Sequence, residues 1–502
     1  MRTLSLAGRL RAAGARVQFI CRAHPGHLID WIEARKFTVH HLAEPVGVSA
    51  QSDGQGGAHA HWLHVTQEQD AQEVVAVLHS VGVIDWLVVD HYALDSLWER
   101  RVRPHVGRLL VIDDLADRPH VCDLLLDQNL HQEMTLRYQT RIPPHCTLLL
   151  GPQYALLRPE FASARDGMRE RDGVVRRILI FFGGVDADNM TTKALEAMVA
   201  LERPDLQVDV VVGRSNPHRG QVRALCDHRP WLHYHEQVDN MAQLMAQADL
   251  SIGAAGTTSW ERCCLGLACV LVIVAANQRL VAHVQAAAGV AVVLGESGDV
   301  SSAQLTEVVR NVVHDPGQCR QMQKKAASLC DGLGVNRVAM ALLPLFAKDG
   351  QPLGLRPATW ADMEQVWEWQ RAPGTRRYAR HPQVPTIEEH RQWFAQRLQN
   401  SRCVFNIILH AQQPVGVLRL DRLPDAAVPR YEISIFLAPE RYRLGIASGA
   451  LQLARMLLPD AEFLAEVLED NLASMALFQS LGYVRQESGA FICFPSKESL
   501  AD

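Results

Sequence analysis

The sequence lacks several features that would assign it to a class at once. It has no apolar run of the roughly 18 residues that a membrane span requires, and Arg9 and Arg11 interrupt its first apolar stretch too early for a secretory signal. Neither sign of charge is in excess, because 50 Lys and Arg residues stand against 55 Asp and Glu residues. We therefore expect neither a membrane nor nucleic acid among its partners. Internal repeats and low-complexity tracts are also missing.

The 11 cysteines form no metal or disulfide pattern. No CxxC pair recurs at the spacing of a zinc site, and adjacent cysteines such as Cys263 and Cys264 rarely form a bridge. We expect buried, reduced thiols in a cytoplasmic protein, with no metal. His59, His61 and His64 form an HxHxxH pattern that can bind metal in principle, but a solvated loop is the interpretation that we favour.

At roughly 100–200 residues per domain, the chain length of 502 residues predicts three domains. Short apolar runs separated by turn-rich or helical segments predict parallel strands in the first two domains. The expected strands are Trp86–Val89, Leu109–Ile112, Leu124–Leu126, Ile178–Phe182, Val208–Val212, Leu250–Ile252 and Val270–Val274. The segment Asp349–Pro357, with two prolines and two glycines, is interpreted as a linker. The domains are expected at residues 1–160, 161–347 and 354–495.

The amino terminus begins with a helix pattern and not with a strand. Leu4, Leu6 and Leu10 fall near helical spacing, Gly14 ends the pattern, and Val17–Ile20 follows as a buried strand. A helix that leads into a core strand is the second half of a β-α-β unit. We therefore expect the first strand of this sheet to be missing.

Two loops of the second predicted domain suit an anion. Phe182–Asp186 (FGGVD) contains Gly183 and Gly184, which let backbone N–H groups approach a phosphate, although such a turn also needs glycine for its own geometry. Gly253–Glu261 (GAAGTTSWE) brings small residues and hydroxyl groups to a helix start. Glu261 could reach ribose hydroxyls, or it could be an ordinary first-turn acid that the helix dipole favours.

Seven motifs in order resemble the UDP-sugar hydrolase of pseudaminic acid biosynthesis, over about residues 1–345. They are DHYALD (90–95), IDDLADR (112–118), DLLLDQN (123–129), GPQYALLRPEF (151–161), FGGVDADN (182–189), IGAAGTTSWERCCLGL (252–267) and ANQ (276–278). The resemblance implies an α/β fold, a GT-B-like pair of Rossmann-type domains. It also implies the release of UDP from UDP-2,4-diacetamido-2,4,6-trideoxy-β-L-altropyranose by water.

Roles for single residues follow from the loops and the resemblance together. The predicted UDP- and sugar-binding residues are Gly183, Gly184, Met241, Gly256, Thr257, Thr258, Glu261, Asn277 and Gln278. Glu261 would hold the ribose, and Met241 stands where the family holds uracil through backbone groups. Asn277 and Gln278 would approach the sugar from the second domain. Tyr92 would face it from the first domain as a catalytic residue.

The sequence departs from this family at its start. In the family, a short strand and a Gly-x-Gly-His-x-Met-Arg turn come first, whereas this sequence begins at Met1-Arg2 of that turn. The family's histidine, its proposed general base, would precede Met1. Either the true start lies upstream or this is a truncated copy, and a start within a motif at an internal methionine favours the first. We expect the chain as given to bind UDP but to hydrolyse the UDP-sugar slowly.

Residues 354–495 follow a different pattern, with two helices before the strands. The expected strands are Phe405–Leu409, Val415–Leu420 and Tyr431–Leu437. Arg441–Ala447 (RYRLGIA) leads into a helix, and Asn471–Tyr483 (NLASMALFQSLGY) follows. These stretches resemble the GNAT N-acetyltransferases, in the branch that acetylates amino sugars. The resemblance implies a GNAT α+β domain with acetyl-CoA as co-substrate.

The implied acetyl-CoA contacts are Leu437, Arg443, Leu444, Gly445, Ile446, Ala447, Asn471 and Ser474. Tyr442 stands where the family usually has Arg or Gln, and Phe478 stands where many members use a tyrosine as general acid. Tyr483 is interpreted as a core residue. Glu432 is the predicted general base and Glu466 the second candidate, although both could be strand carboxylates that point to solvent.

Together the two resemblances predict a bifunctional cytoplasmic enzyme of pseudaminic (nonulosonic) acid biosynthesis. One half would acetylate the 4-amine of a UDP-amino-sugar with acetyl-CoA, and the other would release UDP from the product with water. A fusion of consecutive steps raises the local concentration of the intermediate at the second site. Two alternatives remain open: a GT-B glycosyltransferase fused to an acetyltransferase, and a UDP-sugar-binding scaffold without catalysis.

Overall fold

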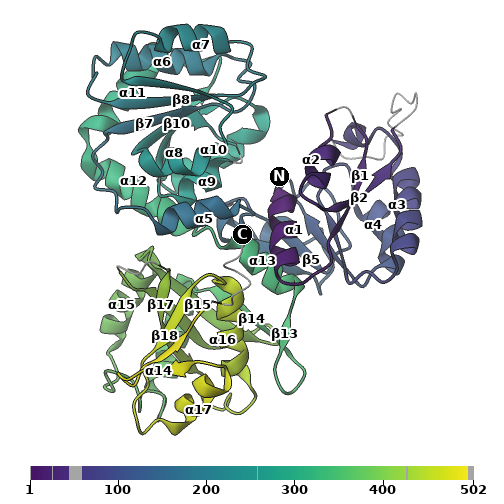
Figure 1. The fold of residues 1–502 in the computed structure, drawn as a ribbon, viewed down its shortest axis with the longest axis vertical. Helices are drawn as coiled ribbons and strands as arrows, with labels where there is room; N and C mark the ends of the chain where they lie inside the picture. The colour runs from purple at the N-terminus through teal and green to yellow at the C-terminus, as the bar shows by residue number, and fades with distance from the viewer. Residues whose placement is uncertain (1, 25, 45–58, 257, 425–427, 496–502) are drawn as a thin grey trace. The chain divides into compact units, whose positions relative to one another are not determined.

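The computed structural model describes residues 2–24, 26–44, 59–256, 258–424 and 428–495 (Figure 1). The chain divides into two compact units, Met1–Arg158 and Pro159–Asp502. The break lies within two residues of the expected end of the first domain. The other two predicted domains both lie in the second unit, where each has a sheet of its own.

The first unit is built from short parallel strands and helices. Its strands are β1 (Gln18–Arg22), β2 (Thr38–Leu42), β3 (Trp86–Val89), β4 (Arg108–Ile112), β5 (Leu124–Asp127) and β6 (Thr147–Leu150). Its α-helices are α1 (Arg2–Ala12), α2 (Ile29–Glu33), α3 (Gln67–Val81) and α4 (Ser96–Val102). Strands β4 and β5 are almost wholly buried, as continuous apolar runs predict for parallel strands that are covered on both faces.

These six strands form two sheets, with the break between β1 and β3. Among the described residues, β1 pairs only with β2, and β3 pairs only with β4 in a sheet of order β3-β4-β5-β6. In a Rossmann fold of order 3-2-1-4-5-6, the first strand lies between the second and the fourth. No strand of the described residues pairs with both β1 and β3, which stand as the second and fourth strands of that order. Leu42, Val74 and Leu109 share one core cluster, so the hydrophobic core continues across the break.

The second unit begins with α5 (Pro159–Asp166) and a parallel sheet of order β12-β11-β10-β7-β8-β9. The strands are β7 (Arg177–Phe181), β8 (Gln207–Val212), β9 (Leu232–Glu236), β10 (Leu250–Ala254), β11 (Ala268–Ile273) and β12 (Ala291–Glu296). The helices are α6 (Met190–Ala200), α7 (Arg219–Cys226), α8 (Met241–Gln247), α9 (Thr258–Cys264), α10 (Arg279–Ala287), α11 (Ser302–His314), α12 (Pro316–Leu329) and α13 (Gly334–Leu342). This strand order is that of a Rossmann fold, with β7 as its first strand.

A second sheet in this unit has the order β13-β14-β15-β16-β17-β18-β20-β19. Its strands are β13 (Leu345–Phe346), β14 (Pro352–Pro357), β15 (Cys403–His410), β16 (Gln413–Arg422), β17 (Arg430–Leu437), β18 (Glu462–Ala465), β19 (Val484–Arg485) and β20 (Phe491–Cys493). Its helices are α14 (Met363–Arg371), α15 (Ile387–Gln399), α16 (Ile446–Leu457) and α17 (Leu472–Ser480). The pair β17–β18 is parallel, whereas the other pairs of this sheet are antiparallel.

The interpretation of Asp349–Pro357 as a linker is wrong for its last six residues, which form β14. This strand pairs with β13 and β15 and begins the eight-stranded sheet. Leu353 and Leu355 are buried at alternating positions, while Pro352 and Pro357 stand at the strand ends, where proline disturbs a sheet least. Two alternating leucines between two prolines form too short a pattern to predict a strand from the sequence.

Candidate functional site

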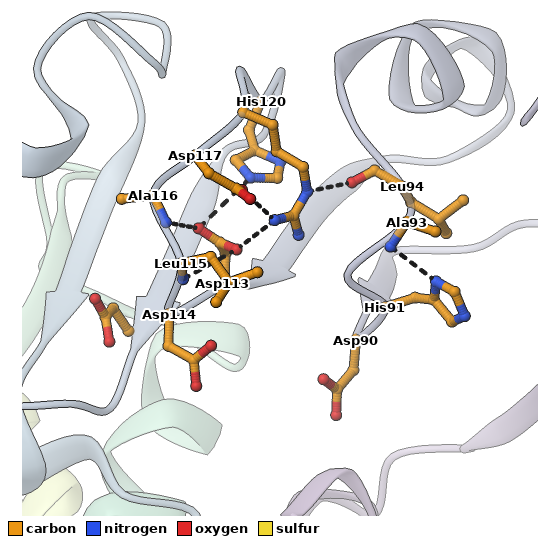
Figure 2. A network of polar contacts seen from close by, with 12 residues as sticks. Asp90, His91, Ala93, Leu94, Asp113, Asp114, Leu115, Ala116, Asp117 and His120 are labelled. Carbon is orange, nitrogen blue, oxygen red and sulfur yellow. Dashed lines mark hydrogen bonds and ion pairs between the residues drawn. The ribbon is translucent and has the colours of Figure 1, made fainter. Parts of the chain in front are cut away.

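Aspartates gather at the carboxyl edge of the larger sheet of the first unit. Strands β3, β4 and β5 are parallel, so their carboxyl ends meet at one edge. Asp90 follows β3, Asp113 and Asp114 follow β4, and Asp127 ends β5. Figure 2 shows the first three of these side chains. Because α/β sheets bind ligands outside the carboxyl ends of their strands, this edge is the candidate site of the first unit.

Two of these aspartates are held by short charge-assisted hydrogen bonds. Arg2 Nη2 and Thr3 Oγ1 donate to Asp90 at 2.6 and 2.7 Å. Burial would raise the pKa of Asp90, but the bonds from Arg2 and Thr3 lower it. Arg137 Nη1 donates to Asp127 Oδ2 at 2.6 Å. Both carboxylates are thus neutralised by neighbouring donors.

Asp113 belongs to a buried charge network behind the edge (Figure 2). Its carboxylate lies 2.8 Å from Arg118 Nη1 and accepts a hydrogen bond from the backbone N–H of Ala116 at 2.9 Å. His120 Nδ1 lies 2.6 Å from Glu99 Oε1, and both side chains are buried. Burial would lower the pKa of His120, but Asp113 and Glu99 raise it to about 9. The imidazole is therefore protonated at neutral pH and anchors the loop after β4.

This network makes the stability of the chain pH-dependent. Because the folded pKa of His120 lies near 9 and its ordinary value is 6.5, the protonated form stabilises the fold fully below pH 6.5, and this effect is lost as the pH rises through 9. We expect the free energy of unfolding to fall by roughly 1–3 kcal/mol across that window. The variant His120→Gln should be less stable than the wild type below pH 6.5, and its stability should depend less on pH.

Denaturant titrations at several pH values measure the free energy of unfolding, with exposed His145→Gln as the control. Equal pH dependence in wild type and His120→Gln would contradict the prediction.

Asp114 differs from the other three aspartates. Arg2 Nη1 and Asn129 Nδ2 lie 3.4 and 3.2 Å from its Oδ2, longer than charge-assisted bonds usually are. Burial and the neighbouring aspartates raise the pKa of Asp114, although Arg2 and a hydrogen bond from Tyr92 oppose them. The pKa of Asp114 is therefore raised, whereas those of Asp90 and Asp113 are lowered. The sequence analysis missed Asp114, because nothing in the IDD motif separates it from Asp113.

Tyr92, predicted to face the sugar, lies at this edge among aromatic rings. The ring centroids of His59 and Trp62 are 5.7 and 5.9 Å from that of Tyr92, and burial raises the pKa of its phenol.

The ring centroids of His24 and His64 lie 5.0 Å apart. Within the described ranges, no three His, Cys, Asp or Glu side chains form a group that could hold a metal ion.

In the six-stranded sheet, the loops after β7 and β10 flank the point where the strand order reverses, which is where such sheets bind ligands. The first loop contains Gly183, with a φ of 95°, and Gly184, and a side chain added at either position would meet no atom within 4 Å. Asp186 accepts the backbone N–H groups of Met190 and Thr191 at 2.9 Å each. The start of α6 is therefore already capped, and an anion here would contact the glycine loop instead.

The loop after β10 is bonded to a buried arginine. Thr257 lies outside the described residues. Arg262 is 2% exposed and donates to Ala254 O at 2.8 Å, to Ser259 Oγ at 3.2 Å and to Thr258 Oγ1 at 3.3 Å. No carboxylate in the described part of the chain forms an ion pair with it. A buried guanidinium thus places positive charge behind a loop of small residues, an arrangement that favours an anion. The sequence analysis did not name Arg262.

The other predicted UDP-sugar residues lie at the carboxyl edge of this sheet. Asn277 and Gln278 form part of the short helix η5 (Ala276–Gln278), after β11. The Nε2 atom of Gln278 lies 3.9 Å from where a Cβ at Gly256 would stand, so these two predicted residues are brought together. Met241 is buried at the start of α8, after β9, and Glu261 lies in the first turn of α9.

The eight-stranded sheet opens between β17 and β18. Strand β17 pairs with β16 along residues 431–437, but with β18 only at residues 430–432. Beyond Glu432 this edge of β17 has no strand partner among the described residues, so its backbone groups remain open to a ligand. The open stretch ends at the buried Leu437.

Gly445 precedes α16, at the predicted pyrophosphate turn. Its φ is 78°, a conformation that glycine adopts readily, and no side chain caps the helix. The first N–H groups of α16, at Ile446–Ala447, can therefore bind an anion. The carbonyl of Leu444 accepts a hydrogen bond from the backbone N–H of Lys348 at 3.0 Å, and Arg443 is exposed.

Two predicted acetyl-CoA contacts serve first to cap a helix. Asn471 Oδ1 accepts the backbone N–H of Ser474 at 3.1 Å, which satisfies the start of α17. Phe478 and Tyr483 are buried together, with ring centroids 5.0 Å apart, so Tyr483 is a core residue as expected. The Phe478 ring has no proton to give, and another group must protonate the leaving thiolate.

The two predicted general bases lie side by side. Glu432 on β17 and Glu466 just after β18 both accept from Arg380 Nη2, at 2.6 Å each. The carboxylates are 27% and 59% exposed, so both reach solvent. The sequence analysis did not name Arg380, which lies 52 residues from Glu432 in the chain.

Comparison with known families supports both halves. Residues 353–484 match the model of the GNAT acetyltransferase domain, and residues 177–336 match that of the C-terminal domain of glycosyltransferase family 28. The chain is a fusion of a GT-B-like region with a carboxy-terminal GNAT acetyltransferase domain.

Three relatives cover different parts of the chain. The spore coat polysaccharide biosynthesis protein SpsG of Bacillus subtilis is 29% identical over 217 residues, 43% of this chain and 63% of that protein. The UDP-2,4-diacetamido-2,4,6-trideoxy-beta-L-altropyranose hydrolase of Campylobacter jejuni is 25% identical over 172 residues, 34% of this chain and 60% of that protein. The chain thus spans less than two thirds of either relative. An uncharacterised protein of Methanocaldococcus jannaschii is 22% identical over 421 residues, 81% of this chain and 82% of that protein.

Among solved structures, MurG of Acinetobacter baumannii aligns with a TM-score of 0.49 and 15% identity, over 68% of this chain and 95% of that one. In the described ranges, none of the helices has both the length and the apolar character that crossing a membrane would require.

Proposed function

We propose that this chain is a bifunctional enzyme of pseudaminic acid biosynthesis. Its GNAT domain would acetylate the 4-amine of a UDP-amino-sugar, and its GT-B-like region would hydrolyse the resulting UDP-2,4-diacetamido-2,4,6-trideoxy-altropyranose to UDP and the free sugar. The observation that supports the proposal is the presence, in one chain, of a loop of small residues backed by the buried Arg262 and of a GNAT sheet that opens between β17 and β18. The Campylobacter jejuni relative suggests the sugar.

The acetyl transfer uses groups at the open end of β17. Acetyl-CoA supplies the acetyl group as a thioester, with its pyrophosphate at the start of α16. Glu432 accepts the proton that the acceptor ammonium loses. The amine nitrogen then forms the bond to the acetyl carbon while the C–S bond breaks, and the second proton that the nitrogen loses passes through water to the departing thiolate to give free CoA.

For the hydrolysis, candidate residues lie at the carboxyl edge of each Rossmann-type sheet, each considered within its own unit. Gly256, Thr258 and Arg262 would hold the diphosphate, and Glu261 the ribose. We propose Asp114 as the general base, because its pKa is raised while Asp90 and Asp113 are held ionised by their partners. Asp114 takes a proton from water, the water oxygen bonds to the anomeric carbon, and the C–O bond to the diphosphate breaks to release UDP.

Product analysis with the full chain tests this proposal. We expect a UDP-4-amino-sugar with acetyl-CoA to give free CoA thiol and then UDP, and the diacetamido UDP-sugar with water alone to give UDP and free sugar. Thiol release is followed with a disulfide reagent, and products by chromatography. Transfer of the sugar to a second acceptor in place of water would favour a glycosyltransferase. Tight UDP binding without any turnover would favour a binding scaffold.

A further inference from the structure

The contact of Arg380 with Glu432 and Glu466 has the form of an occupied cation site. One guanidinium nitrogen bonds to both carboxylates at 2.6 Å. The Arg380 side chain is 62% exposed and belongs to a loop, so little packing holds it there. Two partly exposed carboxylates around one cation can equally hold an ammonium group. The amine that an acetyltransferase accepts is such a group before it loses its proton.

The loop that carries Arg380 is strongly basic. Residues 372–386, between α14 and α15, contain three arginines and a histidine but no aspartate or glutamate. Arg376 donates to Gln370 Oε1 at 2.7 Å and to the carbonyl of His381, and these bonds tie down the start of the loop. Arg377 is exposed and forms no ion pair with a carboxylate of the described residues. Arg380 therefore brings positive charge to the carboxylate pair, and Arg377, three residues earlier in the same loop, adds a second exposed guanidinium to that loop.

The carboxylates of Glu432 and Glu466, together with the basic loop 372–386, favour an acceptor that carries both a positive and a negative group. A polyamine would fit the carboxylates but be repelled by the loop, whereas an amino sugar on a diphosphate carries an ammonium and an anion together. We propose that the acceptor's ammonium replaces Arg380 between Glu432 and Glu466, and that Arg377 and the released Arg380 bind its phosphates. This inference rests on the proposed acetyl transfer and assigns the residues that recognise the nucleotide part of the acceptor.

The experiment compares two acceptors in the full-length chain: a UDP-4-amino-sugar and the same amino sugar without nucleotide. In the wild type we expect the nucleotide-linked acceptor to have the lower KM. Arg377→Ala should raise that KM by about tenfold, the effect of losing one charge-assisted contact. It should leave the KM values for the free amino sugar and for acetyl-CoA unchanged. Arg377→Lys should retain much of the preference for the nucleotide-linked acceptor. The control Arg402→Ala, at an exposed arginine elsewhere in the domain, should leave all of these KM values unchanged.

The outcomes separate this inference from the proposed function. If the wild type acetylates the UDP-amino-sugar and Arg377→Ala keeps the same preference for it, the phosphate-binding role is wrong and the proposed function stands. Acetylation of spermidine with an equal or lower KM would also overturn the inference. If the wild type acetylates no UDP-amino-sugar at any concentration, the proposed acetyl transfer itself fails.

Discussion

Replacing Gly445 by valine is expected to abolish acetyl transfer while UDP binding is unchanged. A valine side chain at the entrance of α16 would stand between the helix N–H groups and the pyrophosphate, and its Cβ would lie 3.2 Å from Lys348 Cγ. The pyrophosphate would then lose the backbone donors on which its binding depends. Release of CoA thiol measures acetyl transfer. Titration with UDP in a calorimeter measures UDP binding.

The matched control for this variant is Gly482→Val. Gly482 has a φ of 79°, against 78° for Gly445, so valine strains both backbones alike, but nothing lies within 4 Å of the Cβ position at Gly482. We expect Gly482→Val to be destabilised yet able to bind acetyl-CoA. Similar acetyl transfer by the two variants would show that the start of α16 is not the pyrophosphate site.

Asp114→Asn is expected to lower UDP-sugar hydrolysis by about 10²–10⁴-fold, the usual contribution of a general base. Because the pKa of Asp114 is raised, hydrolysis by the wild type should increase with pH at values above the ordinary titration range of an aspartate. This increase should disappear in Asp114→Asn. Released UDP, measured across the pH range, provides the rate, and UDP affinity should stay the same because the nucleotide loop lies in the second unit.

The control is Asp85→Asn, an exposed aspartate at the opposite end of β3, which should hydrolyse at the wild-type rate. Equal hydrolysis by wild type and Asp114→Asn would exclude Asp114 as the base. No hydrolysis by the wild type would instead support the expectation that the histidine of the Gly-x-Gly-His turn is required.

Much of the fold follows from the sequence alone. The strands β3, β4 and β5 lie within one residue of their predicted bounds, because a strand covered on both faces is a continuous apolar run that can be read locally. The ordered motifs likewise identified a nucleotide-sugar region and a GNAT domain, since each motif is contiguous in the chain.

Only the tertiary structure decided which charged groups surround each candidate. Asp113 and Asp114 are adjacent and identical in type, yet Asp113 meets Arg118 and His120, whereas Asp114 meets Arg2 and Asn129 at longer distances and also Tyr92. Likewise, Glu432 and Glu466 are neighbours only because β17 and β18 run side by side beneath Arg380. Local sequence determines which residues are buried along a strand or helix. Ionisation depends on distances between charges far apart in the chain, and these exist only after the chain has folded.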